Sequence, residues 1–507
     1  MPRLQDLGSE RLRGMRRGIE KESLRTDERG ALALTPHPRA LGSALTHPHI
    51  TTDYSESQLE LITGVHASPE ACLDELRTLH QFTYRAIGDE LMWVASMPCK
   101  LPADENIPIG VYGPSNLGRA KSVYRMGLGH RYGRRMQTIS GIHYNWSLPG
   151  LSGDDYFALI RNFRRHSFVL LYLYGASPAV CQCFVDGRPH ELQELGPGTQ
   201  HLPFATSLRM GRLGYQSDAQ ATIAASYNGL ESYAASLHGA MTRPYPAYEA
   251  IGVRNPGGEY NQLATTLLQI ENEFYGTIRP KRVIRTGERP LHALRERGVE
   301  YVEVRCMDLD PFEPLGIAVP TMRFLDVFLL HCLVSPSAPD TPAEIAALGR
   351  NQHKTAAQGR RPGLTLEREG RDVSLVDWAR EIVAECRPIA ELLDSLHGGH
   401  AHREALAQAD LRLRDAAATP SARVLQAMVA DHERSYSAFV LERSRRTRAE
   451  TLALPFAPEA EAAQRQQAEA SLREQQRIEA APQPDFEQFR VDYLSPSRLV
   501  VAPATIA

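Results

Sequence analysis

Acidic residues that alternate with large apolar residues in strand-like segments are the feature that most constrains this fold. In residues 299–305, Val302 and Val304 fall on one face of a period-two strand, whereas Glu303 and Arg305 fall on the other. An unpaired buried carboxylate is too costly to retain, so such groups are normally neutralised by cations or metal ions. The segment therefore predicts a strand with one face in the core and the other on a charged site.

Three other strand-like segments repeat this pattern. They are residues 18–22 with Glu20 and Glu22, residues 58–62 with Glu60, and residues 137–146 with His143 and Asn145 opposite Ile142, Tyr144 and Trp146. Four strands that each project acids or a histidine predict the wall of a metal-filled pocket.

Composition sets the class of protein. Of the 507 residues, 42% are hydrophobic and 23% are charged, which is typical of a globular protein with ample material for a core. The net charge of −3 argues against a general nucleic-acid binder. No stretch approaches the length of a membrane span and the N-terminus lacks a signal-peptide core, so we expect a cytoplasmic protein with no membrane association.

The spacing of Cys181 and Cys183, the one close pair among seven cysteines, is not that of a structural zinc site, which favours reduced thiols.

The order of the expected elements favours an α+β fold. Strands are predicted at 16–25, 56–65, 136–148 and 299–308, and helices at 68–91, 154–172, 321–334 and 375–396. Strands and helices do not alternate strictly, which argues against a doubly wound parallel sheet. We expect a compact body at 12–455, with an outer helical layer at 340–450, and a charged C-terminal tail at 456–507 that is helical or partly disordered.

The acids form the first candidate site. Hard cations such as Mg²⁺ prefer oxygen ligands and usually bind through a few carboxylates together with substrate phosphates. The candidate metal ligands are Glu20, Glu22, Asp53, Glu60, His143 and Glu303. The alternative is that each acid pairs with a nearby arginine, for which Arg17, Arg25 and Arg305 are available.

Basic and aromatic residues form two further candidate groups. The chain has no Walker A loop, so if ATP binds here, it binds through metal ions and arginines. Arg279, Lys281 and Arg282 lie in a basic run at 278–285 and suit phosphate, although a solvated basic turn is the alternative. Further candidates for substrate contacts are Tyr124, Arg125, Arg209, Tyr215, Tyr275 and Arg305. Tyrosines beside arginines suit a small pocket that binds a carboxylate, although a single tyrosine is more often core or surface filling.

Six segments together resemble the glutamate–cysteine ligase family of the proteobacterial type (type 1). They are residues 17–25 (RGIEKESLR), 51–56 (TTDYSE), 137–145 (QTISGIHYN), 204–209 (FATSLR), 278–282 (IRPKR) and 300–305 (EYVEVR). The resemblance covers residues 12–450 and does not extend to the tail.

This resemblance implies a cup-like antiparallel sheet surrounded by helices, related to the catalytic domain of glutamine synthetase. It implies ATP-dependent ligation of the γ-carboxylate of L-glutamate to L-cysteine through γ-glutamyl phosphate, the first step of glutathione biosynthesis. The six acidic and histidine candidates match the family's metal ligands, for two or three Mg²⁺ ions with Mn²⁺ as a substitute. Tyr124, Tyr215 and Tyr275 match positions around the cysteine pocket, while Arg209 and Arg305 match cations that contact substrate and phosphate. A monomer and feedback inhibition by glutathione are also expected.

Two other readings stay open on the sequence. One is a different amide-forming or phosphoryl-transferring enzyme on the same sheet, such as a glutamine synthetase or a guanidino kinase. The other is a non-catalytic metal-binding or interaction protein.

Overall fold

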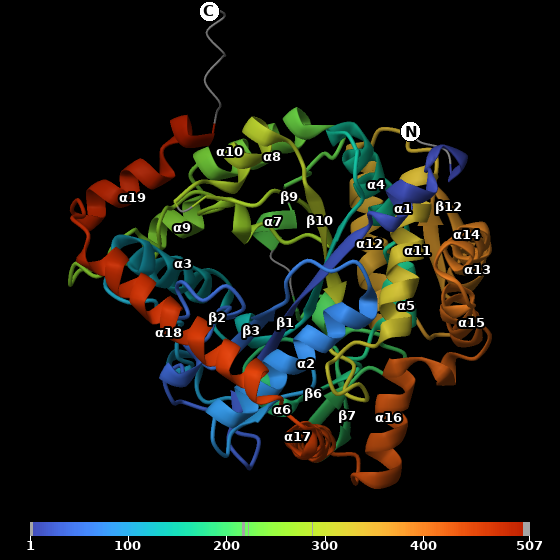
Figure 1. The fold of residues 1–507 in the computed structure, drawn as a ribbon, viewed down its shortest axis with the longest axis horizontal. Coiled ribbons are helices and arrows are strands. Elements are labelled where there is room, and N and C mark those ends of the chain that lie inside the picture. The colour runs from blue at the N-terminus through green and yellow to red at the C-terminus, as the bar shows by residue number, and fades with distance from the viewer. Residues whose placement is uncertain (1–3, 215–217, 222, 286, 500–507) are drawn as a thin grey trace, which may run out of the picture.

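An antiparallel sheet forms the centre of the molecule (Figure 1). The computed structural model describes residues 4–214, 218–221, 223–285 and 287–499. Within these residues, seven strands form the main sheet in the order β2-β3-β1-β5-β10-β9, and β4 pairs with β1. Their bounds are β1 Arg16–Thr26, β2 Ile50–Thr52, β3 Gln58–Ile62, β4 Leu91–Met92, β5 Ile142–Ser147, β9 Ile278–Lys281 and β10 Tyr301–Met307.

Strand register places the acidic residues side by side on one face of the sheet. Glu20 of β1 lies opposite His143 of β5, and Glu22 lies opposite Glu60 of β3. Glu303 of β10 lies between Asn145 of β5 and Arg279 of β9. Directly opposed residues in antiparallel strands share a face, so the period-two pattern gathers these groups into one surface.

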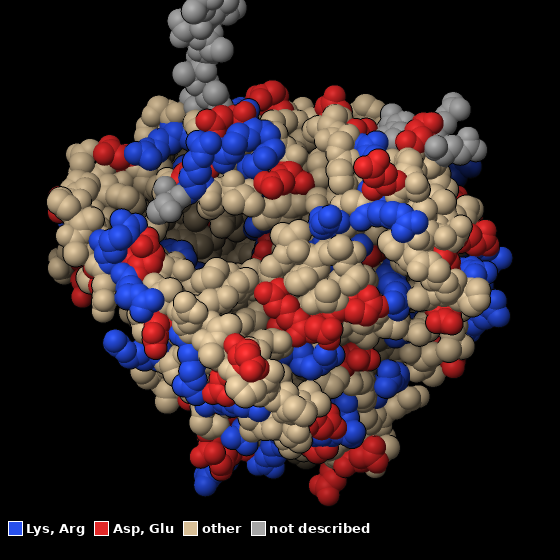
Figure 2. Space-filling view, viewed as in Figure 1, with Lys and Arg blue, Asp and Glu red and all other residues tan. Residues whose placement is uncertain are grey.

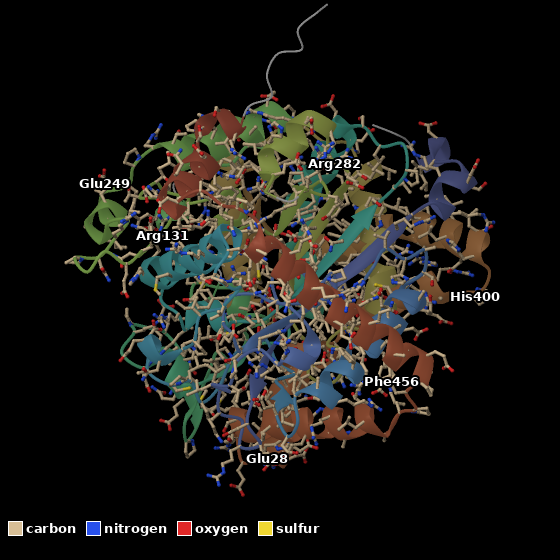
Figure 3. All side chains as sticks on the ribbon, turned by 60° about the vertical axis from the view of Figure 1, so that its left-hand side comes forward. Glu28, Arg131, Glu249, Arg282, His400 and Phe456 are labelled. Atoms are coloured by element: carbon tan, nitrogen blue, oxygen red, sulfur yellow. The ribbon has the colours of Figure 1, made fainter. Side chains whose placement is uncertain are left out.

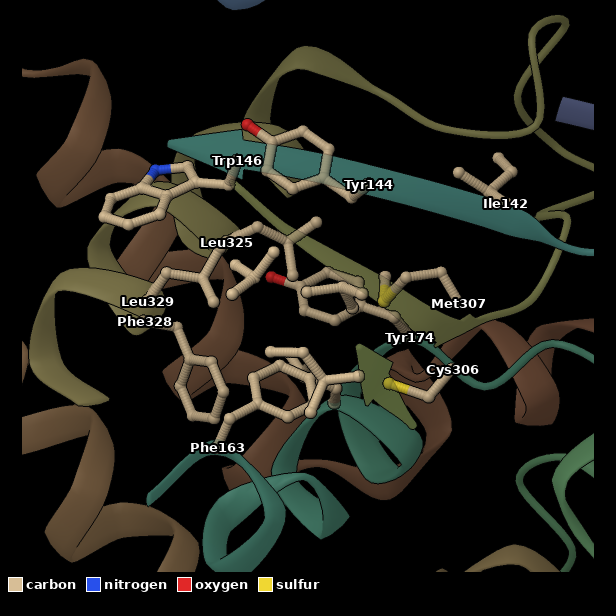
Figure 4. Packing of buried hydrophobic residues seen from close by; sticks show 14 of the residues in the cluster. Ile142, Tyr144, Trp146, Phe163, Tyr174, Cys306, Met307, Leu325, Phe328 and Leu329 are labelled. Carbon is tan, nitrogen blue, oxygen red and sulfur yellow. The ribbon is translucent and has the colours of Figure 1, made fainter. Parts of the chain in front are cut away.

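The other face of the sheet carries the hydrophobic core. Ile142, Tyr144 and Trp146 of β5 belong to the same buried cluster as Leu325 and Phe328 of a covering helix (Figure 4). The helices packed on or beside this face are α2 Pro69–Ala86, α4 Gly153–His166, α5 Phe168–Tyr174 and α11 Val319–Val334. Alternation within one strand therefore separates a dry face from a charged one.

A buried ion pair ties this face to α11. A guanidinium nitrogen of Arg17 lies 3.0 Å from Asp326 Oδ2, and both side chains are almost wholly buried. Tyr144 donates a hydrogen bond to Asp326 Oδ1 at 2.7 Å. Because both charges are withdrawn from water, either residue alone would be costly to bury.

The remaining elements enclose the sheet. Two small sheets contain β6 Ala179–Cys181, β7 Gln193–Gly196 and β8 Thr199–His201, and β11 Thr365–Arg368 with β12 Arg371–Ser374. The other helices are α1 Ser9–Arg13, α3 Asn116–Tyr132, α6 Gln182–Val185, α7 Asp218–Ala221, α8 Leu230–Thr242, α9 Pro246–Ile251, α10 Pro290–Arg297, α12 Pro342–Gln358, α13 Leu375–Glu385, α14 Arg387–His397, α15 Ala401–Arg414, α16 Pro420–Asp431, α17 Tyr436–Ala453, α18 Pro458–Ala480 and α19 Phe486–Leu494. Among the residues described, no helix is long and apolar enough to cross a membrane.

The C-terminal segment runs back across the body as two helices. Ser43 donates its backbone N–H to Ser471 Oγ of α18 at 2.9 Å. A Cβ atom added at Gly42, which has a φ of +85°, would lie only 2.4 Å from the same oxygen, so close approach requires glycine here. Beyond α18, Asn116 donates its backbone N–H to Gln483 and its side-chain amide to the carbonyl of Pro484, so the segment also contacts the start of α3.

The α+β class and the antiparallel cup are confirmed, while several predicted helices differ in their limits. The predicted helix 375–396 is two helices that meet at Cys386, because Pro388 has no N–H and fits only the first turn of a new helix. The predicted helix 154–172 is likewise divided at Ser167. The predicted strand 136–148 begins as a 3₁₀ turn at 136–138 and becomes a strand only at Ile142.

Candidate active site

The charged face of the sheet forms the floor of a cavity of about 300 Å³. Figure 2 shows a deep hollow in this face of the molecule, between α3 and α10 of Figure 1, with lysines and arginines at its rim. Strands β1, β2, β3, β5, β9 and β10 supply the floor, and α3 with the loop before β9 supplies the walls. The charged and polar side chains that line it include Glu20, Asp53, Glu60, Lys121, Tyr124, Arg125, Gln137, His143, Asn272, Tyr275, Arg279, Lys281, Glu303 and Arg305.

Glu20 and His143 form a hydrogen-bonded pair at the middle of the floor. His143 Nδ1 lies 3.1 Å from Glu20 Oε2, and the amide of Asn145 donates to Glu20 Oε1 at 2.9 Å. Burial and the charge of Glu303 act to raise the pKa of Glu20, but the hydrogen bond from His143 and the charge of Lys281 outweigh them, so the net shift is downward. Glu20 is therefore held as a carboxylate.

The neighbouring acids lie where their charges repel. Oxygen atoms of Glu22, Asp53 and Glu60 lie within 4.8 Å of one another. Burial, reinforced by Asp53 and partly offset by Arg209, raises the pKa of Glu22 to about 8. Burial and the charges of Glu20, Asp53 and Glu22 raise the pKa of Glu60 well above its ordinary value. This half of the floor consequently favours a positive ion, or protons in its place.

Glu303 lies in the opposite electrostatic environment. Its Oε1 is 3.0 Å from Lys281 Nζ, and its Oε2 is 3.1 Å from a guanidinium nitrogen of Arg305. Although burial opposes ionisation, these two cations with His143 hold the pKa of Glu303 well below its ordinary value. The Glu303 half of the floor therefore carries fixed positive groups beside a fixed carboxylate.

The donor atoms fit a hard divalent cation. Glu20, Glu60 and His143 form a second group whose ligand atoms lie within 4.8 Å, so Glu60 belongs to both groups. Among the described residues, His143 Nε2 has no hydrogen-bond partner although it is buried. Five carboxylates and one imidazole nitrogen suit Mg²⁺ or Mn²⁺, since sites for softer metals use thiolates.

A second, smaller cavity of about 80 Å³ adjoins the floor, and Arg209, Arg305 and Tyr275 line it. Arg209 is almost wholly buried and donates to the carbonyl of Arg305 at 2.8 Å. An added Cβ at position 141 would lie 2.1 Å from the Arg209 guanidinium, so a larger residue there would displace this cation. Gly141 also donates its N–H to Glu22 Oε2 at 2.7 Å, which fixes that carboxylate beside the cation.

Helix α3 supplies the wall opposite the sheet. Tyr124 is half-buried, and removal of its hydroxyl from water together with the charge of Glu273 raises its pKa well above the ordinary value, so the phenol stays neutral. Arg125 stacks on Tyr112 at 4.5 Å and donates to the backbone carbonyls of Asp53 and Lys121. Arg125 thus holds the loop that carries Asp53 as well as lining the cavity.

The structure does not bring every predicted residue into the cavity. Arg282 faces away from it: its guanidinium donates to the carbonyls of Arg297 and Gly298 and lies 3.5 Å from Glu300. Figure 3 labels it in the upper part of the molecule. The cause is the strand period, because Arg279 and Lys281 share one face of the chain and residue 282 has the opposite parity. Tyr215 lies outside the described residues.

Arg279 lies in the cavity wall but also has a structural task. It donates to the carbonyls of Asn272 and Phe274, and so anchors the loop that carries Tyr275. Tyr275 in turn accepts a hydrogen bond from Gln137 at 2.8 Å.

Among the charged and amide side chains that line the main cavity, sequence reasoning missed Lys121, Gln137 and Asn272. Lys121 carries the clearest signal, because positions 121, 124, 125 and 128 occupy one face of a helix. Burial and the nearby Arg125 lower its pKa to about 8. The amides carry no comparable signal in their spacing.

Comparisons with known proteins place this geometry in a family. A family model described as glutamate–cysteine ligase matches residues 3–355. The chain is 49% identical over 490 residues to a glutamate–cysteine ligase of Pseudomonas entomophila, covering 93% of this chain and 92% of that one. It is 47% identical over 508 residues to one of Alcanivorax borkumensis, covering 95% and 96%. A crystal structure of glutamate–cysteine ligase from Francisella tularensis in complex with AMP superposes with a TM-score of 0.91 at 36% identity, covering 96% of this chain and 98% of that one. A bifunctional glutathione synthetase from Pasteurella multocida gives a TM-score of 0.69 at 25% identity, covering 89% and 55%.

Proposed function

This chain belongs to the glutamate–cysteine ligase family, enzymes of glutathione biosynthesis, and we propose that its cavity joins L-glutamate to L-cysteine at the expense of ATP. The observation that carries the proposal is the division of the floor. Glu22, Asp53 and Glu60 form an acid-rich half, and Lys281 and Arg305 flank Glu303 in the other half. A nucleoside triphosphate with its metal ion needs acids to hold the metal and cations to hold the phosphates within one cavity.

The reaction needs an activated carboxylate, because a carboxylate and an amine do not condense at neutral pH. An oxygen of the glutamate γ-carboxylate attacks the terminal phosphorus of ATP, and the bond to the leaving ADP breaks. The amine of cysteine then attacks the acyl carbon of γ-glutamyl phosphate, phosphate leaves with the bonding electrons, and the amine releases a proton. The products are γ-glutamylcysteine, ADP and phosphate.

The acids provide the sites for magnesium. Glu22, Asp53 and Glu60 would hold one ion, and Glu20, Glu60 and His143 a second, with Glu303 as a further ligand and Mn²⁺ as a substitute. When bound, the ions withdraw charge from the ATP phosphates. The AMP bound to the Francisella relative supports a nucleotide site in this fold.

The cations and aromatic residues take the other roles. Arg305 and Lys281 offset the negative charge that grows on the transferred phosphoryl group. Arg209 lines the adjoining small cavity with Tyr275, where a substrate carboxylate can meet a guanidinium and a phenol. Tyr124 and Arg279 complete the wall.

Shielding from water is a further requirement, since the acyl phosphate hydrolyses if water reaches it. The low exposure of the innermost residues supports such shielding, because Glu22, His143, Arg209 and Glu303 are each at most 3% exposed. A buried floor also strengthens every electrostatic contact to the bound substrates.

One incubation tests the proposal. Purified protein with ATP, Mg²⁺, glutamate and cysteine should yield γ-glutamylcysteine and ADP in equal amounts. Recovery of AMP would refute the acyl-phosphate route, and faster reaction with ammonia or creatine than with cysteine would transfer the chain to another activity. Glu20→Gln or Glu303→Gln should reduce turnover by orders of magnitude while the fold persists, whereas near-normal turnover in both would make them structural ion pairs.

Glutathione should inhibit competitively with glutamate, because it contains the γ-glutamylcysteine product as part of its own structure. A single chain contains all the proposed ligands, so we propose that the monomer is active. Inhibition that glutamate cannot relieve would argue against the first point, and loss of specific activity on dilution would argue against the second.

A further inference from the structure

Three thiols that are distant in sequence meet outside the cavity. The sulfur atoms of Cys99, Cys181 and Cys183 lie within 4.8 Å of one another. Cys99 is 2% exposed, while Cys181 and Cys183 are half-buried. The first lies in the loop after β4, and the other two lie at the end of β6 and in α6.

The loop around Cys99 is shaped toward the other two sulfurs. Lys100 has a φ of +47°, an uncommon backbone conformation for a residue with a side chain. In this conformation the N–H of Lys100 lies against the sulfur of Cys181 and the N–H of Leu101 against that of Cys183. Consecutive backbone N–H groups directed at sulfur stabilise negative charge on it.

The electrostatics of the cluster agree with this geometry. Hydrogen bonds from the Cys183 and Cys99 thiols, with the N–H of Lys100, lower the pKa of Cys181 to about 2. Hydrogen bonding to Cys181 raises the pKa of Cys183 to about 11. Three sulfur atoms this close together form a set that one metal ion could bind, with release of the thiol protons to solvent.

We propose that Cys99, Cys181 and Cys183 form a site for one thiophilic divalent cation of the Zn²⁺ class. Three thiolates at about 2.3 Å from a tetrahedral ion lie about 3.8 Å apart, so closure requires sulfur movements of about 1 Å or less. Among the described residues no fourth His, Cys, Asp or Glu joins the group, which leaves the fourth position to water on the half-exposed side. Sulfur donors also distinguish this site from the oxygen-lined cavity, which suits harder ions.

The position of the site indicates a structural cross-link. Arg135 donates to the carbonyl of Cys183 at 2.8 Å, and the next turn of the chain carries Gln137, which lines the active cavity. A bound ion would therefore fix the loop after β4 and the β6–α6 turn behind one wall of the active cavity. We expect it to raise thermal stability more than it changes turnover.

The test uses Cd²⁺ or Co²⁺ added to the reduced full-length protein in saturating Mg²⁺, so that the oxygen ligands of the cavity are occupied. One equivalent should give thiolate-to-metal charge-transfer absorption and raise the melting temperature. Cys99→Ser and Cys183→Ser should each abolish that absorption, while Cys386→Ala, which removes a buried thiol outside the cluster, should retain it.

Ligase turnover and circular dichroism check that each variant is folded. Absence of charge transfer from the folded wild-type protein would overturn the proposal. So would absorption that persists in both serine variants. A disulfide within the cluster, found by mass spectrometry in protein that still fails to bind the metal after reduction, would also overturn it and identify a redox site.

Discussion

Arg305→Ala should reduce the maximal rate of the ligase reaction far more than it weakens glutamate binding. The Arg305 side chain lies between the two cavities, with a guanidinium nitrogen 3.1 Å from Glu303 Oε2. From there it can contact the phosphoryl group in transfer, whose charge grows as the transition state is approached.

The magnitude follows from two losses. Removing a charge-assisted contact to a transition state costs about 3 kcal/mol, which is about a hundredfold in rate. The variant also leaves Glu303 with one fewer of the cations that lower its pKa, so the floor loses positive charge as well as a hydrogen-bond donor. We therefore expect a hundredfold or greater fall in kcat.

The assay is steady-state formation of γ-glutamylcysteine, together with ATP-driven phosphorylation of a tight sulfoximine inhibitor in the absence of cysteine. Arg305→Ala should slow both reactions. Arg282→Ala is the matched control, because Arg282 belongs to the adjacent strand region but its side chain points away from the cavity, and it should retain turnover within a few-fold. If Arg305→Ala changed only the KM for glutamate or cysteine, the residue would be a carboxylate clamp and its phosphate role would be refuted.

Three other perturbations probe the cavity, the core and the thiols. Glu60→Gln removes the acid shared by the two proposed metal-ligand groups. Mg²⁺-dependent turnover should fall by orders of magnitude, with the melting temperature unchanged or higher. Normal turnover would exclude Glu60 as a ligand. Asp326→Ala should cost about 3–5 kcal/mol in urea unfolding because it leaves Arg17 buried without its partner, and the double variant Arg17→Met with Asp326→Leu should recover most of that loss; equal instability of both would show that the pair's charge is not the cause. Joint replacement of Cys181 and Cys183 by serine should leave turnover within a few-fold, and a strict requirement for either thiol would contradict their placement outside the chemistry.

The strands of the site could be predicted because their information is local. In β10 the alternation of Val302 and Val304 with Glu303 and Arg305 specifies both faces of one strand, and neighbouring segments repeat the rule. The same alternation places Arg282 on the opposite face of the chain from Lys281, and so outside the cavity. What remained a prediction is the chemical role of each residue, since geometry places a side chain but does not assign its substrate.

The parts that could not be predicted depend on contacts between distant segments. Period and composition do not specify that β1 lies between β3 and β5, nor that Cys99 meets Cys181 and Cys183. The single residue between Cys181 and Cys183 argued against a structural zinc site, but that spacing carries no information about the distant Cys99. Contacts of this kind are fixed only when the whole sheet and its covering helices assemble.

The path of α18 has a consequence for the order in which the molecule is built. Ser471 meets Gly42 and Ser43, and Gln483 meets the first turn of α3, the helix that supplies one wall of the cavity. During synthesis the acids of the floor, up to Glu303, emerge before the segment that braces their surroundings. That wall therefore acquires these contacts only after residues 471–484 have emerged, and a message truncated after residue 455 would yield a floor without this brace.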